Sequence, residues 1–212
     1  MDEPLSNLDA KLRNQMRAEI IKLRERINTT FIYVTHDQTE AMTLGDRIVI
    51  MKDGEVQQIG TPQQVFNHPY NLFVAGFIGT PQMNFFNDAK LVKENGKYAV
   101  KLADLTVELS EEKQARLAAH DVQPQAVTLG IRPEHLRLAE NGEAALCGQV
   151  DVTEMMGSSV HLHVNAMGGT AILVVQSMGL TRKFDIGQTV AFTFDGDVAH
   201  VFSKETERNL EF

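Results

Sequence analysis

The sequence predicts an α/β module over residues 1–80, followed by an all-β module, a barrel or a sandwich, over residues 81–212. Two observations predict this division. In the first 80 residues, amphipathic helical patterns alternate with short apolar strands, as in α/β folds. Beyond residue 83, short strands follow one another closely, which is typical of β-barrels and sandwiches.

The composition is that of an acidic globular protein. Of 212 residues, 43% are hydrophobic and 23% are charged, and the formal net charge is -8. This charge, with no run of five basic residues, argues against nucleic acid or an anionic membrane surface as a direct partner. No apolar stretch approaches the roughly 20 residues that span a bilayer, and no signal peptide is seen. A single cysteine excludes an internal disulfide and fits a cytoplasmic location.

The first module opens with a helix and a strand. Leu12, Met16 and Ile20 recur at helical spacing, which predicts a helix over 10–27 with Asp9 as its N-cap. Residues 29–35 are a continuous β-branched and aromatic run, as expected of a strand buried on both faces of a parallel sheet. A capping-box pattern at Asp37–Glu40 predicts a short helix that ends near Gly45, and Lys52-Asp53-Gly54 predicts a β-hairpin. Two more helices are predicted, one behind Thr61-Pro62 and one over 70–78.

Turn residues indicate where the elements of the second module begin and end. Asn95-Gly96 between two apolar runs predicts a β-hairpin, and Ser110 precedes the one predicted helix, over 110–119. The remaining predicted strands are 105–109, 127–131, 146–152, 160–164, 171–175, 190–194 and 198–202.

Two adjacent carboxylates at the start of the chain are the first candidates for chemistry. At the mouth of a parallel sheet, Asp2 can hold Mg²⁺ through water, while Glu3 polarises an attacking water. His36 follows the predicted strand, at the edge where α/β folds bind ligands. Its imidazole can donate to a γ-phosphate oxygen, or it can hold Glu3 and the water in place.

The stretch Asp2-Glu3-Pro4-Leu5-Ser6-Asn7-Leu8-Asp9 resembles the end of the Walker B strand and the D-loop of ABC-transporter ATPases. Residues 33–42 resemble the switch-histidine region of the same family. Residues 73–85, the stretch Gly130-Ile131-Arg132-Pro133-Glu134-His135 and residues 201–206 resemble the regulatory domain of carbohydrate-importer ATPases of the maltose-transporter type.

This resemblance implies roles for particular residues. Glu3 is the expected catalytic base, His36 the γ-phosphate sensor, and Asp2 the Mg²⁺-associated carboxylate in an ATP site. The D-loop residues Ser6, Asn7 and Asp9 are expected to face a partner subunit and couple the two ATP sites. The resemblance also implies an oligonucleotide-binding-type, TOBE-like barrel that pairs two subunits, and a cytoplasmic ATPase dimer docked beneath two membrane permease subunits.

The phosphate-cradling pattern G-x-x-x-x-G-K-[ST] does not occur in the 212 residues. We therefore interpret the chain as a C-terminal part of an ATPase subunit for carbohydrate import, inactive by itself and binding neither ATP nor Mg²⁺ alone. The alternatives are a non-catalytic dimerisation or regulatory module and an independent ligand-binding barrel. Without the rest of the sheet, we expect an exposed apolar edge at residues 29–35 and a first module less stable than the barrel.

Two further pairs have competing interpretations. Arg132 and Glu134 form either a surface ion pair at the bend around Pro133, which we favour, or a ligand site. His161 and His163 alternate within one strand and therefore share a face. Without a nearby cysteine or carboxylate ligand they make a weak metal site.

Overall fold

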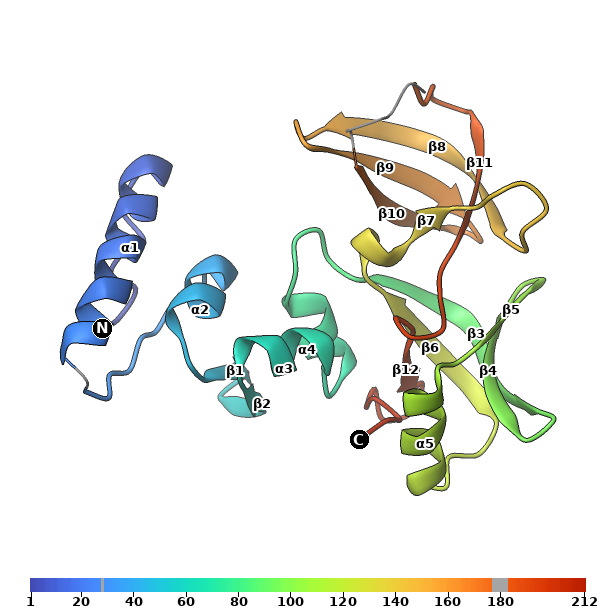
Figure 1. Cartoon of the computed structure of the whole chain (residues 1–212), viewed down its shortest axis with the longest axis horizontal. Helices are drawn as coiled ribbons and strands as arrows, with labels where there is room; N and C mark the ends of the chain where they lie inside the picture. Colours follow the sequence, from blue (N-terminus) through green and yellow to red (C-terminus); the bar gives the residue numbers. More distant parts are fainter. Residues whose placement is uncertain (28, 177–182) are drawn as a thin grey trace. The chain divides into compact units, whose positions relative to one another are not determined.

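The computed structural model describes residues 1–27, 29–176 and 183–212 (Figure 1). They form two compact units, Met1–Tyr70 and Asn71–Phe212. The predicted boundary near residue 80 thus differs from the division of the structure, because helix α4 (Leu72–Phe77) belongs to the second unit. Its first amide, of Leu72, donates to the Glu207 carbonyl at 3.0 Å, which attaches the helix to the end of the same unit.

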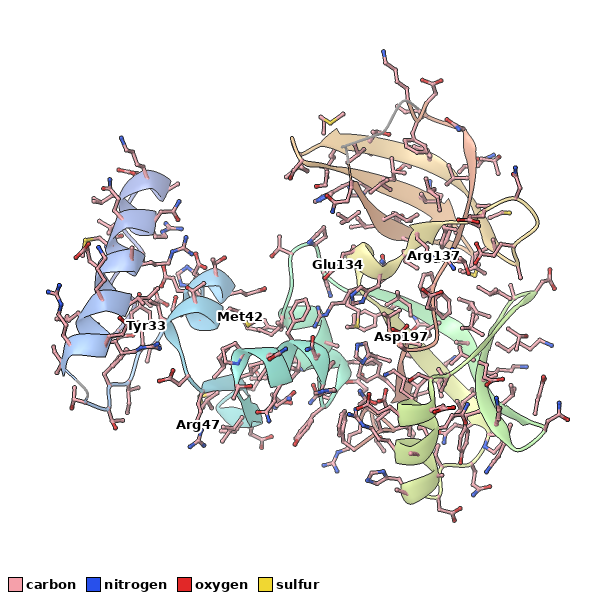
Figure 2. The ribbon with its side chains drawn as sticks, in the orientation of Figure 1. Tyr33, Met42, Arg47, Glu134, Arg137 and Asp197 are labelled. Atoms are coloured by element: carbon pink, nitrogen blue, oxygen red, sulfur yellow. The ribbon has the colours of Figure 1, made fainter. Side chains whose placement is uncertain are left out.

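The first unit combines helices with a β-hairpin, which confirms its predicted α/β character. Its elements are α1 (Ala10–Ile27), α2 (Gln38–Leu44), β1 (Ile48–Lys52), β2 (Glu55–Gly60) and α3 (Pro62–Asn67). Leu5, Ile20 and Leu44 form a small buried cluster. Tyr33, labelled in Figure 2, is partly buried against it.

Local signals set the element boundaries. The Asp9 carboxylate accepts from the Leu12 amide at 2.9 Å and so caps α1. Asp37 caps α2, and Thr61 closes a full capping box with Gln64 at the start of α3. The turn between β1 and β2 places Asp53 and its glycine neighbour at positive φ, as a two-residue type I′ hairpin requires.

The strand predicted over residues 29–35 is not formed. Val34 makes a single parallel bridge, to Asp2, and Ile32 and Val34 are 78% and 50% exposed. Among the described residues, only the segment Met1–Glu3 pairs with this stretch. A strand buried on both faces needs a sheet neighbour on each side, so this stretch forms no strand and its side chains stay partly or fully exposed. Its exposure agrees with the expected uncovered edge.

The second unit contains two antiparallel sheets and confirms the predicted β-rich fold. Their orders are β10-β9-β8-β11-β7 and β12-β6-β3-β4-β5. The helices and strands are α4 (Leu72–Phe77), β3 (Asn84–Glu94), β4 (Lys97–Leu102), β5 (Leu105–Glu108), α5 (Glu111–Ala119), β6 (Gln125–Ile131), the 3₁₀ helix η1 (Pro133–His135), β7 (Arg137–Leu138), β8 (Leu146–Met155), β9 (Ser159–Ala166), β10 (Gly169–Gln176), β11 (Thr189–Thr193) and β12 (His200–Ser203). Sequence analysis missed η1 and β7, which are too short to show a period.

One hydrophobic core joins the two sheets. Leu129 of β6, Leu162 of β9 and Phe192 of β11 have no exposed surface and belong to the same buried cluster. Full burial of such a side chain contributes about 1.5–3 kcal/mol, so this shared core is the main source of stability of the unit. The all-β module, predicted as a barrel or a sandwich, therefore consists of two sheets on a common core.

Candidate functional site

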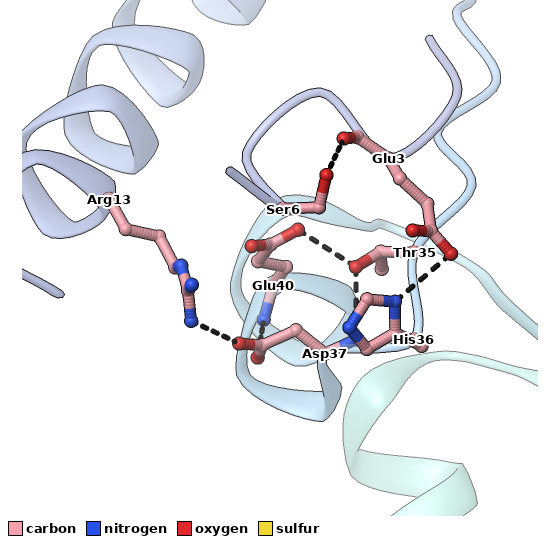
Figure 3. A pocket seen from close by; sticks show the side chains of 7 residues that line it. All are labelled: Glu3, Ser6, Arg13, Thr35, His36, Asp37 and Glu40. Carbon is pink, nitrogen blue, oxygen red and sulfur yellow. Dashed lines mark hydrogen bonds and ion pairs between the residues drawn. The ribbon is translucent and has the colours of Figure 1, made fainter. Parts of the chain in front are cut away.

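A small pocket in the first unit collects polar side chains from two segments that are distant in sequence (Figure 3). One segment leads into α1, and the other runs from the extended stretch into α2. The residues that line the pocket are Glu3, Ser6, Arg13, Thr35, His36, Asp37 and Glu40.

The backbone pairing of the extended stretch with the chain start brings the segments together. The Val34 amide donates to the Met1 carbonyl at 2.9 Å, and the Glu3 amide donates to the Val34 carbonyl at 2.8 Å. Because His36 lies two residues after Val34, this pairing fixes it close to Glu3.

Glu3 and His36 are in direct contact. The distance from Glu3 Oε1 to His36 Nδ1 is 3.0 Å, and the two side chains are 44% and 73% exposed. The hydrogen bond to Glu3 and the charge of that carboxylate raise the pKa of His36 above its ordinary value. Desolvation opposes this rise, and the charges of Asp37 and Glu40 add to it by smaller amounts.

Glu3 has an unusual backbone conformation. Its φ is 40°, in the left-handed region that side chains other than glycine rarely adopt. The Ser6 hydroxyl donates to the Glu3 carbonyl at 2.9 Å and closes the turn. Strained residues of this kind cluster at functional sites, where the surrounding hydrogen bonds hold them.

A second group of residues, not found by sequence analysis, forms hydrogen bonds around the buried carboxylate of Glu40. Glu40 is only 2% exposed, and its Oε2 accepts from the Tyr33 hydroxyl at 3.0 Å and the Thr35 hydroxyl at 2.8 Å. Burial and the neighbouring Glu40 raise the pKa of Tyr33. The capping-box pattern marked Glu40 as a helix residue but carried no signal for its burial.

Arg13 of α1 lies on the other side of the pocket. Its Nη1 is 3.5 Å from Asp37 Oδ2, and its Nη2 donates to the Leu8 carbonyl at 3.0 Å. The pocket therefore contains a guanidinium and an imidazole as well as three carboxylates, those of Glu3, Asp37 and Glu40.

The structure brings together only part of the predicted site. Glu3, His36 and Ser6 line the pocket, whereas Asp2, Asn7 and Asp9 are not among the described residues that line it. Asp9 serves as the cap of α1. Asp2 and Asn7 are exposed on the same loop.

The residues present fit a role in Mg²⁺ binding only in part. The carboxylate of Asp2 is exposed and offers the oxygen ligands that Mg²⁺ prefers. Among residues 1–27, 29–176 and 183–212, no group of three or more acidic, histidine or cysteine side chains can hold a metal. In proteins, Mg²⁺ is usually bound by one or two carboxylates together with substrate phosphates and waters.

Arg132 is not the surface residue that we expected. It is 2% exposed, and its Nη1 donates to the Ile78 carbonyl at 2.7 Å, at the end of α4. Burial lowers the pKa of Arg132 to about 10, and the charge of exposed Glu134 opposes this shift. Arg132 therefore has a structural role in joining α4 to the sheets of the second unit.

His161 and His163 do share one face of β9, since both are partly exposed and alternate with buried neighbours. His163 Nε2 lies 3.0 Å from Glu154 Oε2 on the adjacent strand. Sequence analysis did not anticipate this carboxylate, because the pairing of β8 with β9 supplies it.

Two family models match the second unit. The model described as MalK OB fold domain matches residues 79–136, and the model described as TOBE domain matches residues 129–202. "Oligosaccharides import ATP-binding protein MsmX" of Bacillus subtilis is 44% identical over 98% of this chain and 56% of its own length. The chain is homologous to the C-terminal region of ABC transporter ATP-binding proteins.

Other ABC transporter ATP-binding proteins match similarly. "Trehalose import ATP-binding protein SugC" of Mycobacterium tuberculosis is 43% identical over 99% of the chain and 58% of its own length. "Putative uncharacterized ABC transporter ATP-binding protein YcjV" of Escherichia coli is 45% identical over 98% of the chain and 55% of its own length. The chain thus spans little more than half the length of these ABC relatives.

A solved structure of the cytoplasmic molybdate-binding protein ModG matches 56% of the chain and 94% of its own length, with a TM-score of 0.42 and 16% identity.

Within the described part of this ABC homologue, no helix has the length and apolarity to cross a membrane.

Proposed function

We propose that this chain is part of the ATP-hydrolysing subunit that energises carbohydrate import by an ABC transporter. The contact between Glu3 and His36 carries the proposal, because it joins a carboxylate and an imidazole in one polar pocket. The names of two relatives, which refer to oligosaccharide and trehalose import, support carbohydrate as the substrate class.

In this proposal, each residue acts on the terminal phosphate or the attacking water. Glu3 is the general base that polarises the water, and His36 donates a hydrogen bond to a γ-phosphate oxygen while it orients Glu3. Asp2 would help to hold Mg²⁺. When bound with ATP, Mg²⁺ neutralises charge that develops on the phosphates.

The loop around Ser6, Asn7 and Asp9 couples two subunits in this proposal. Ser6 closes the turn that contains Glu3, so a partner subunit that binds this loop would change the position of the Glu3 carboxylate. We further propose a homodimer that pairs through the OB and TOBE domains, docks onto membrane permease subunits and lies at the cytoplasmic face of the membrane. Nucleic acid is not a partner in this proposal.

The test is a chimera in which this chain replaces the matched region of MsmX, which it resembles at 44% identity. We expect the chimera to hydrolyse ATP and to restore oligosaccharide uptake in cells that lack MsmX. Glu3→Gln should lower kcat by about 10²-fold or more, since general-base catalysis contributes about 10²–10⁴-fold. His36→Ala should also lower kcat strongly.

Glu94→Gln is the matched control, because Glu94 is an exposed carboxylate at the end of β3 in the second unit. It should leave the ATPase rate of the chimera unchanged. Glu3→Gln with the rate of the parent chimera would show that Glu3 is not the base.

A second candidate is a non-catalytic pairing or regulatory module. Its supporting observation is that the OB and TOBE matches and one continuous core occupy most of the second unit. Sedimentation equilibrium and calorimetry with millimolar Mg-ATP on the 212-residue chain separate the two candidates. A dimer that binds no nucleotide, together with an inactive chimera, would favour the second.

A further inference from the structure

We propose that Glu40 is a positioning residue that holds His36 against Glu3 by fixing the backbone on both sides of the imidazole. The catalytic meaning of this role rests on the function proposed above. Its structural basis is a closed ring of hydrogen bonds among Thr35, Asp37 and Glu40, which Figure 3 shows around His36.

The ring closes in three steps. The Thr35 hydroxyl donates to Glu40 Oε2 at 2.8 Å, the Asp37 amide donates to the Thr35 hydroxyl oxygen at 3.0 Å, and the Glu40 amide donates to Asp37 Oδ1 at 3.1 Å. His36 lies between two of the three members. Its backbone therefore cannot rotate without breaking at least one of these hydrogen bonds.

The burial of Glu40 exceeds what a helix cap requires. In an ordinary capping box the third helical residue returns its side chain to the cap amide. Here the Thr35 hydroxyl takes that position at the Asp37 amide, and the Glu40 carboxylate turns inward to Thr35 and Tyr33. Burying a carboxylate costs free energy, which charge-assisted hydrogen bonds from hydroxyls reduce. The arrangement is explained if the Glu40 carboxylate serves to hold Thr35, whereas helix capping alone does not explain it.

His36 needs such a support because its own packing is weak. Its side chain is 73% exposed, and the one ion pair that the described residues give it is with Glu3, itself 44% exposed. An exposed ion pair contributes little to stability, because holding two side chains in one geometry costs conformational entropy. A fixed backbone on both sides of His36 lowers the conformational entropy that is lost when His36 and Glu3 form their contact.

The test is an NMR titration of the His36 imidazole in the 212-residue chain. The charged groups that face it are Glu3, Asp37 and Glu40. Thr35→Val is the decisive variant because it breaks the ring without changing any charge, and Thr35→Ser is its matched control because it keeps the hydroxyl. Glu3→Gln supplies the reference state in which the pair is lost.

We expect the pKa of His36 to be raised in the wild type and in Thr35→Ser. In Thr35→Val it should fall most of the way to the value of Glu3→Gln. In a Glu3→Gln background, Thr35→Val should cause no further shift, because Thr35 acts through the pair. An unchanged His36 pKa in Thr35→Val, or an equal fall in both backgrounds, would overturn the proposal.

Amide spectra of α1 and α2 report whether the variants remain folded. If Thr35→Val disrupts them, Tyr33→Phe provides the same comparison, because it removes the other hydroxyl donor to Glu40 and leaves Thr35 in place. We then expect a smaller fall of the His36 pKa, and no fall would overturn the proposal. The titration involves no nucleotide, so an inactive chimera with the expected titration would refute the proposed function and leave the positioning role intact.

Discussion

The buried ion pair between α5 and the end of the chain gives a sharp prediction for stability. Lys113 Nζ lies 2.6 Å from Glu211 Oε1, and the two side chains are 9% and 1% exposed. Arg116 provides a second, longer contact to the same carboxylate at 3.4 Å. Lys113→Met removes the closest cation but replaces the aliphatic stem with one of similar size. The variant therefore measures the effect of the lost charge on stability, with little loss of packing.

Removing one partner of a buried pair costs about 3–5 kcal/mol, because the other charge remains buried without compensation. Since Arg116 still faces Glu211, we expect a loss near the lower end, about 3 kcal/mol. The double variant Lys113→Met/Glu211→Met should recover to within about 1 kcal/mol of the wild type, because a well-packed apolar pair of similar volume replaces the ion pair.

The assay must separate the two units, because a chain with two compact units need not unfold in one transition. Hydrogen exchange at increasing urea, read from peptides of β6 and β12, reports the free energy of unfolding of the second unit alone. A Lys113→Met chain within about 1 kcal/mol of the wild type would refute this account of the buried charge. A double variant as unstable as the single variant would refute the isosteric replacement.

Three further outcomes are expected. Gly196→Ala should destabilise the second unit by more than about 2 kcal/mol in the same exchange assay, because its Cβ would overlap the Glu108 carbonyl, while Gly169→Ala, in open space, should have little effect. Arg137 lowers the pKa of Glu143 to about 2. This pair therefore stabilises the fold above the ordinary glutamate pKa and loses its effect as pH falls toward 2; in Arg137→Gln, the Glu143 titration followed by NMR should return to ordinary values. Calorimetry of the 212-residue chain with millimolar Mg-ATP should show no binding heat, and a saturable heat would contradict the predicted need for a phosphate loop.

Sequence analysis predicted the features that local chemistry determines. The caps at Asp9 and Thr61 and the hairpin at Asn95-Gly96 each depend on residues within a few positions, and the structure confirms them. The contact of Glu3 with His36 was one of two roles that we considered for the histidine. The resemblance to ABC ATPases was needed to relate these two distant residues to one site.

The features that were missed depend on partners distant in sequence. The apolar run over residues 29–35 has the composition of a buried strand, but burial requires neighbouring strands on both sides, and the described chain supplies pairing on one. From sequence alone, Arg132 is expected at the surface, but in the structure it is buried and donates to the Ile78 carbonyl at the end of α4. No local pattern indicates that β12 pairs with β6, although this pairing completes one of the two sheets.

The candidate site has two independent supports, and both act on the backbone. The pairing of Met1–Glu3 with Ile32–Val34 fixes one half of the contact, and the ring through Glu40 fixes the other. Because the side chains of Glu3 and His36 are 44% and 73% exposed, packing cannot replace either support. Variants that keep Glu3 and His36 intact but weaken one support should therefore separate the two side chains. It follows that the geometry of this candidate site depends as much on the residues that fix the backbone as on Glu3 and His36 themselves.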